Sequence, residues 1–147
     1  MNTTADRKFF SVDDANRMLP LVSAIVADIV ELYNDVHERR NRLARVRHHS
    51  SKNTRAEDNP YEEEVLQIEK ELEADIDRLD EFVDELQKLG IELKDPVKGL
   101  VDFPTYHQGR EAYLCWMLGE PEVAFWHDLD AGFGGRQPIE KESITEL

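Results

Sequence analysis

Hydrophobic residues between positions 11 and 89 recur at intervals of three and four, which is the spacing of one face of an α-helix. A first run comprises Val22, Ile25, Val26, Ile29, Leu32, Tyr33, Val36, Leu43 and Val46. A second run comprises Val65, Ile68, Leu72, Ile76, Leu79, Val83 and Leu86. The polar stretch 48–59 (HHSSKNTRAEDN) that separates the runs is typical of a loop. The pattern predicts an antiparallel helical hairpin over residues 11–89.

Local signals mark where these helices begin and end. Ser11, with Asp14 three positions later, has the spacing of a capping box. Pro20 breaks the hydrogen-bond ladder of a helix interior, so we expect a short helical turn before it and the long helix from it onward. The second helix is expected to begin near Pro60, and Gly90 is placed to end it.

From residue 91 to 139 the hydrophobic period shortens, and Gly, Pro and aromatic residues become frequent. The expected strands are 99–103 (GLVDF), 110–118 (REAYLCWML) and 123–128 (VAFWHD), with turns at 104–109 (PTYHQG) and 119–122 (GEPE). Residues 91–94 (IELK) are open to being a fourth strand. The predicted fold class is α+β, in which a long antiparallel helical hairpin with a short N-terminal helix packs on a small C-terminal β-meander. We expect one domain over residues 1–147, with 140–147 as a frayed tail.

Composition narrows the function classes. The 147 residues carry a formal net charge of −14 with a pI near 4.7, which argues against nucleic acid and anionic membranes as partners. The single cysteine excludes an internal disulfide, and the N-terminal residues lack the apolar run of a signal peptide. A cytoplasmic location is therefore expected.

Charge is unevenly distributed along the hairpin. Residues 38–55 carry seven Lys and Arg, whereas residues 57–85 carry fourteen Asp and Glu. Each cluster complements the dipole of its own helix, and in a hairpin the two clusters meet. An RNA-binding patch over Arg39 to Arg55 is the alternative interpretation, and the net charge disfavours it.

The segment 115–128 (CWMLGEPEVAFWHD) holds the cysteine and both tryptophans. A four-residue loop at 119–122 pairs Leu118 with Val123 and Cys115 with Trp126. Cys115 and His127 then lie on opposite faces of the sheet, which counts against a Cys–His nucleophile pair. An odd loop length would reverse this conclusion. With this register Glu120 lies far from His127 and is interpreted as a turn residue or as part of an interaction at the far rim of the sheet.

Several polar residues are expected near the His127 end of the sheet. The candidate ligands of a divalent metal (zinc, iron or manganese) are His127, His107, Asp130 and Glu111. The candidate anion-binding residues are Arg136 and Arg110. The alternative is that His127 is structural and bonds a backbone carbonyl, with His107 merely exposed.

The glycine-rich stretch 128–137 (DLDAGFGGRQ) allows three interpretations. It resembles the opening of a calcium loop but lacks the later acidic ligands. It would also suit an anion-binding backbone nest, and a plain flexible turn is the third interpretation.

Three stretches of the chain resemble a bacterial family known as a domain of unknown function. They are FSVDDANRMLPLV, KDPVKGLVDFP and GREAYLCWMLGEPEVAFWHDLDAGFGGRQPI, and the resemblance spans about residues 9 to 139. The family pattern includes Asp102, Phe103, Pro104, Gly109, Arg110, Cys115, Trp116, Gly119, Glu120, Trp126, His127, Gly132, Phe133 and Arg136. The resemblance implies no activity, but it favours the meander and glycine loop as the working part and the hairpin as scaffold.

Two functions from different classes remain. The first is a divalent-metal-binding protein with its site at the His127 end of the meander, which as an enzyme would be a metal-assisted hydrolase. The second is a non-catalytic module that forms a homodimer through the helical hairpin.

Overall fold

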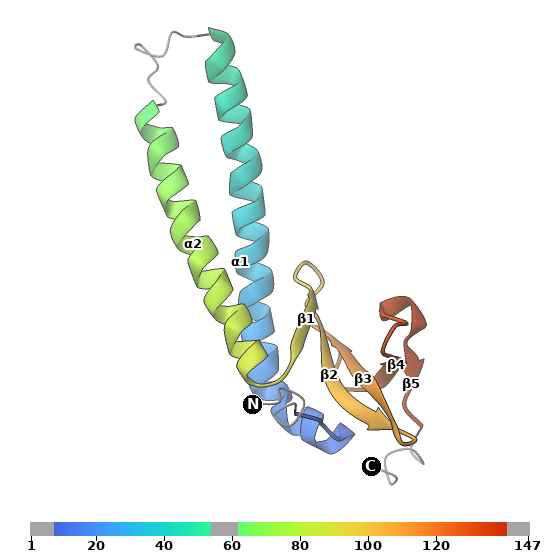
Figure 1. Ribbon diagram of the computed structural model, residues 1–147. Coiled ribbons are helices and arrows are strands. Elements are labelled where there is room, and N and C mark those ends of the chain that lie inside the picture. The colour runs from blue at the N-terminus through green and yellow to red at the C-terminus, as the bar shows by residue number, and fades with distance from the viewer. Residues whose placement is uncertain (1–7, 54–61, 141–147) are drawn as a thin grey trace, which may run out of the picture.

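The computed structural model of the protein describes residues 8–53 and 62–140. These residues form a long helical hairpin followed by an antiparallel sheet, so the predicted α+β fold is confirmed (Figure 1). The elements are α1 (Val12–Asn53), α2 (Glu62–Lys88), β1 (Glu92–Asp95), β2 (Leu100–His107), β3 (Arg110–Met117), β4 (Phe125–Asp128), the 3-10 turn η2 (Phe133–Gly135) and β5 (Gln137–Pro138). The first half of the expected polar loop, residues 48–53, is helical and belongs to α1, so this part of the prediction is wrong; the second half and nearly all of the expected tail lie outside the described residues. Within those residues, no helix is long and apolar enough to cross a membrane.

The start of α1 follows the capping signal, but Pro20 does not divide the helix. The Asp14 amide donates to Ser11 Oγ at 3.0 Å, which confirms the capping interaction. Pro20 lies inside one 42-residue helix, so the expected separate N-terminal helix is wrong. The first turns run at an angle to the rest of α1 (Figure 1), because Pro20 cannot donate to the carbonyl of Asn16. Asn16 Oδ1 accepts a hydrogen bond from the Val123 amide at 2.8 Å, which ties these turns to the sheet.

Both apolar packing and charge pairs hold the two helices together. Away from the sheet, a small cluster of buried side chains fills the hairpin: Leu32, Val36, Leu43 and Leu72. Arg39 of α1 forms an ion pair with Asp75 of α2, and Arg47 pairs with Glu69. The hydrogen bond from Arg39 lowers the pKa of Asp75. The predicted meeting of positive and negative clusters is therefore confirmed for these described residues.

Gly90 ends α2 as its position suggests. Its φ of +88° allows the Ile91 amide to reach back to the Leu86 carbonyl at 3.0 Å. This is the hydrogen bond of a glycine-terminated helix, and it places the chain at the start of β1.

The described strands form one five-stranded sheet in the order β1-β2-β3-β4-β5. Residues 92–95 form β1, so the additional strand that the sequence left open at residues 91–94 is present. The expected turn at 104–109 is wrong, because β2 continues to His107 and only Gln108 and Gly109, both with positive φ, make the turn. Pro104 is tolerated in β2 because its nitrogen, which has no hydrogen to donate, points away from β3 together with its carbonyl, which accepts the Phe10 amide at 2.8 Å.

The pairing of β3 with β4 differs by one residue from the expected register. Cys115 lies opposite Phe125, and Tyr113 lies opposite His127. The number of residues between paired positions of β3 and β4 is therefore odd, not even as expected. Because neighbouring side chains of a strand point to opposite faces, every side chain of β4 lies on the face opposite to the predicted one. His127 consequently shares a face of the sheet with Cys115.

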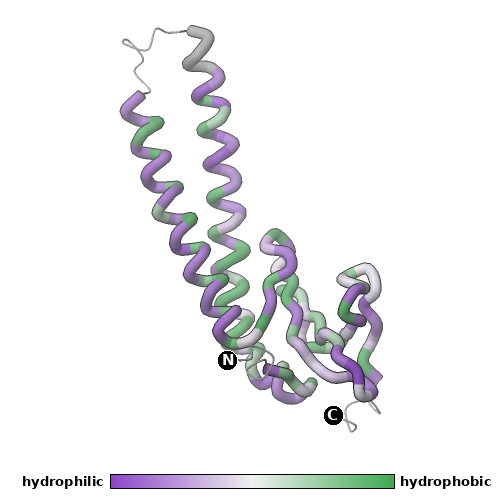
Figure 2. Tube along the Cα trace, in the orientation of Figure 1, coloured by the Kyte–Doolittle hydropathy of each residue, from purple (hydrophilic) through white to green (hydrophobic). Residues whose placement is uncertain are grey.

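The opposite, inner face of the sheet packs on α1. Its buried apolar side chains are Val101, Phe103, Ala112, Leu114, Trp116 and Trp126. They meet the α1 residues Ala15, Leu19, Val22, Ile25, Val26 and Ile29 in one core cluster. Hydrophobic residues are concentrated in the part of α1 that lies beside the sheet, and its distal half is largely hydrophilic (Figure 2). The main core thus lies where the hairpin meets the sheet.

Candidate functional site

The outer face of the sheet, turned away from α1, carries a compact group of polar side chains on three neighbouring strands. Asp102 of β2 and Cys115 of β3 are direct cross-strand partners, and His127 of β4 lies diagonally beside Cys115. One ligand atom from each of these residues lies within 4.8 Å of the other two. All three residues are buried, with 2% or less of their surface exposed. We refer to Asp102, Cys115 and His127 as the outer-face cluster.

Both ring nitrogens of His127 have oxygen partners. Nδ1 lies 2.8 Å from the carbonyl oxygen of Asp128, and Nε2 lies 3.0 Å from Oδ2 of Asp102. Because a carbonyl only accepts hydrogen bonds, Nδ1 carries a proton. Nε2 faces Asp102 Oδ2, so a hydrogen bond joins these two atoms in the metal-free protein, and a metal ion would replace the proton between them.

Burial governs the electrostatics of the cluster. It raises the pKa of the Asp102 carboxyl, although the hydrogen bond with His127 opposes the shift. Oδ1 of Asp102 is buried and has no hydrogen-bond partner within the described ranges. Burial, with the charge of Asp102 added, also raises the pKa of the Cys115 thiol to about 12. Without a bound cation, the cluster therefore combines a protonated thiol with a carboxylate whose burial is only partly offset by His127 and Lys94.

A salt bridge closes one side of this face. Arg136 donates from Nη1 and Nη2 to the two carboxylate oxygens of Glu120, at 2.9 and 2.8 Å. Glu120 Oε1 also accepts the Met117 amide at 2.8 Å, and the guanidinium lies over the ring of Phe125 at 3.9 Å. Burial disfavours the charged form of Glu120, but these hydrogen bonds outweigh it and lower its pKa. The pair fastens the segment before β5 against β3, next to the carbonyl of Cys115 at 3.4 Å.

The structure separates several residues that we expected near one another. His107 stacks on Trp126 at 3.9 Å on the inner face, so it does not meet His127. Arg110 forms an exposed ion pair with Asp128 at 3.5 Å. Glu111 pairs across the sheet with Tyr106, toward the β2–β3 turn.

Arg136 directly precedes β5, which pairs with β4, and its side chain is engaged by Glu120. Of the four expected ligands, His127 and Asp130 line the same cavity, whereas His107 and Glu111 are not among the residues that line it.

Asp102 and Cys115 are the cluster residues that the spacing argument missed. The one-residue register error placed Cys115 on the wrong face, and nothing local in the chain relates Asp102 to His127. The expectation that named all three residues together was the family resemblance.

A cavity of about 240 Å³ opens beside the outer-face cluster. Its lining includes Asp102, His127, Lys94, Tyr113, Asp130 and Phe133. Asp102 and His127 of the cluster therefore border a space that a small molecule can enter.

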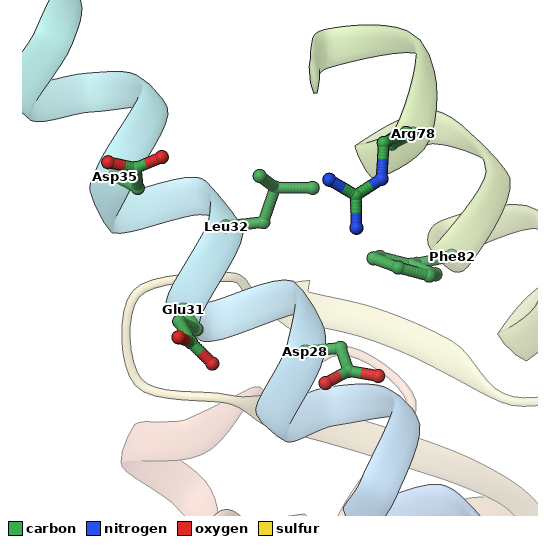
Figure 3. A pocket seen from close by; sticks show the side chains of 6 residues that line it. All are labelled: Asp28, Glu31, Leu32, Asp35, Arg78 and Phe82. Atoms are coloured by element: carbon green, nitrogen blue, oxygen red, sulfur yellow. The ribbon is translucent and has the colours of Figure 1, made fainter.

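A larger depression of about 440 Å³ lies between the two helices. Figure 3 shows Asp28, Glu31 and Asp35 along the α1 side, and Leu32 pointing toward Arg78 and Phe82 of α2. The three acids are exposed, and the Arg78 guanidinium lies 5.8 Å from the centroid of the Phe82 ring. This is a solvated charged surface, and the smaller cavity beside the buried cluster is the candidate site.

Residues 8–139 match the family model described as "Uncharacterized conserved protein (DUF2203)". Comparison with the curated proteins and with the solved structures finds no match to the chain. Because the family model covers most of its length, the protein belongs to the DUF2203 family.

Proposed function

We propose that this member of the DUF2203 family is a zinc-binding protein whose ligands are Asp102, Cys115 and His127. The observation that carries the proposal is the convergence of three buried donor groups within 4.8 Å, one from each of three adjacent strands. A buried carboxylate with an unpartnered oxygen is costly unless a positive charge compensates it. A divalent cation at this point supplies that charge.

The types of the three ligand groups select zinc among the divalent metals. Thiolate and imidazole are soft to borderline ligands that suit zinc, whereas manganese favours oxygen. Iron tolerates the imidazole and carboxylate, but its common mononuclear sites use two histidines with a carboxylate. Zinc also deprotonates a coordinating thiol outright, which would reverse the effect of burial on Cys115. We also propose a reducing cytoplasmic location, which would keep this thiol available.

The surroundings of the donors also fit a metal site. The hydrogen bond between His127 Nδ1 and the Asp128 carbonyl fixes the ring and leaves Nε2 for the ion. The separation of 3.0 Å between Nε2 and Asp102 Oδ2 is suitable for two ligands of one ion.

Three protein ligands leave one position of a tetrahedral ion open, as in catalytic zinc sites. A zinc ion with an open position supplies a bound water with a pKa near 7, so metal-assisted hydrolysis is the reaction class we propose to screen.

The same residues do not favour a cysteine nucleophile. A nucleophilic cysteine needs a lowered pKa and an exposed sulfur, whereas Cys115 is buried with a pKa of about 12. The base also needs a free nitrogen directed at the sulfur, but His127 Nε2 is engaged by Asp102.

Elemental analysis of the purified, untagged protein tests the zinc site. We expect about one zinc per chain in the wild type, and its loss in His127→Ala and Cys115→Ala. His107→Ala is the matched control, because His107 lies on the other face of the sheet and should leave the zinc content unchanged. Circular dichroism would verify that each variant is folded. Absence of zinc from the wild type after incubation with zinc, or full zinc content in folded His127→Ala, would refute the proposal.

A second candidate function is self-association through the helical hairpin. The distal parts of α1 and α2 project beyond the sheet (Figure 1), and Leu66 there is 56% exposed. A homodimer along this surface would cover it. Sedimentation at micromolar concentration decides the question, since a strict monomer would remove this candidate.

A further inference from the structure

The cavity beside the outer-face cluster has a polar floor and an apolar mouth. Asp102 and His127 are at its floor, and both side chains are 3% exposed. Leu129 and Phe133 line it as well, and they are 48% and 40% exposed. Large apolar side chains that remain exposed beside a polar site are typical of a surface that binds an apolar group.

The size of the cavity limits the ligand. Its volume of about 240 Å³ corresponds to roughly eight water molecules in the liquid. This lies below the usual range for drug-sized ligands. The cavity therefore suits a compact molecule and not a nucleotide or a peptide.

Lys94 provides the positive charge of the cavity. Among the described residues that line it, Lys94 is the only Lys or Arg. Its Nζ lies 2.9 Å from Glu92 Oε1 and 5.5 Å from the centre of the Tyr113 ring. The hydrogen bond to Glu92 raises the pKa of Lys94, so its ammonium group is charged at neutral pH.

The charges around the cavity favour a monoanion. Asp102 and Asp130 also line it, so a dianionic phosphate would meet two carboxylates with one lysine to offset them. A carboxylate carries half that charge and can bind both a metal and an ammonium group. Phe133 is held at the mouth by cations over its ring, with Lys98 at 5.6 Å and Arg136 at 4.9 Å, and provides an apolar wall.

We propose that this cavity binds a small carboxylic acid with a compact apolar body. The carboxylate lies between the open position of the metal and Lys94, and the apolar body lies against Leu129 and Phe133. This inference rests on the proposed zinc site, because the metal provides one of the two contacts of the carboxylate.

Replacing zinc by cobalt(II) gives a spectroscopic test that separates the two proposals. Cobalt bound through Cys115 produces a thiolate charge-transfer absorption, and a ligand in the open position changes the weaker visible bands. We would titrate the cobalt protein with benzoate, with the uncharged analogue benzamide and with inorganic phosphate. We expect benzoate alone to change the visible bands at millimolar concentration.

Variants then assign the contacts. Lys94→Met should weaken benzoate binding at least about tenfold, which is about 1.4 kcal/mol, while cobalt binds as before. Lys94→Arg should largely restore the affinity. Lys88→Met is the matched control, because Lys88 lies on α2 and pairs with Asp84. Phe133→Ala should weaken benzoate but leave the binding of acetate unchanged.

The outcomes are distinguishable. Absence of the thiolate absorption would refute the zinc site itself, and with it this inference. A thiolate absorption with no response to benzoate would overturn the carboxylate site and leave the metal site standing. Tighter binding of phosphate than of benzoate, or unchanged benzoate affinity in Lys94→Met, would also overturn it.

Discussion

The two faces of the sheet are built from the same strands but are buried in different ways. The inner face is apolar and is covered by α1, so the hydrophobic effect accounts for its burial. The outer face buries Asp102 and His127, and it is closed by the Arg136–Glu120 pair and the segment before β5. Burial of polar groups costs free energy unless they are fully paired, and Asp102 Oδ1 is not paired within the described residues. The inner face is explained by stability, whereas the outer face calls for a functional explanation.

Truncation of the inner face should have the largest effect on stability. Phe103 is fully buried and contacts Phe10 edge to face at 5.4 Å between ring centroids. We expect Phe103→Ala to lower the free energy of unfolding by about 3–5 kcal/mol, measured by chemical denaturation. Phe125→Ala on the outer face is the matched control and should cost less, because Phe125 is half-buried. Equal losses in the two variants would contradict the difference between the faces.

Removal of Arg136 should have the next largest effect, because Glu120 would remain without its partner. The two side chains are 13% and 19% exposed, so the cost should fall somewhat below that of a fully buried pair. We expect Arg136→Met to lower the free energy of unfolding by about 2–3 kcal/mol. Adding Glu120→Gln should recover part of this loss in a double-mutant cycle. Additive effects of the two changes would mean that the pair does not hold this face together.

Asp102→Asn should have a smaller effect on stability, and in the opposite direction. Burial raises the pKa of Asp102, so its ionised form destabilises the metal-free protein near neutral pH. We expect the metal-free variant to be as stable as the wild type or more stable by about 1 kcal/mol. Zinc should raise the melting temperature of the wild type but not of the variant. A large loss of stability in metal-free Asp102→Asn would show that the carboxylate is structural.

The smallest expected effect is the pH dependence contributed by Glu120. Its pKa is lowered in the folded protein, so it stabilises the fold fully above its unfolded pKa of about 4.3. This contribution is lost as the pH falls through the folded pKa. We expect Glu120→Gln to flatten the loss of stability over that acidic range in denaturation curves. An unchanged slope would mean that Arg136 does not affect the ionisation of Glu120.

Features that depend on local sequence were predictable. The apolar stripes predicted both long helices, Ser11 predicted a cap, and Gly90 predicted the end of α2. Each follows from backbone geometry or side-chain spacing within a few residues of the chain. The charge clusters also predicted contacts between the helices, because a hairpin brings them together.

Features that depend on contacts between distant residues were not predictable. The register of β4 depends on the loop that joins it to β3. In this loop the Trp116 indole donates to the Glu120 carbonyl, and the Val123 amide donates to Asn16, which is 107 positions away in sequence. Because the register decides which residues share the face of His127, the ligand set could not be derived from spacing alone.

The outer-face cluster takes one residue from each of three strands, and this has a consequence for the order of events during folding. Asp102, Cys115 and His127 come together only after β2, β3 and β4 have paired in register. The unfolded chain thus offers no preformed site, so uptake of the proposed ion would follow assembly of the sheet. A bound ion would then join the three strands and slow their separation, as a disulfide would in an oxidising compartment. Metal content would report directly how much of the protein has completed folding.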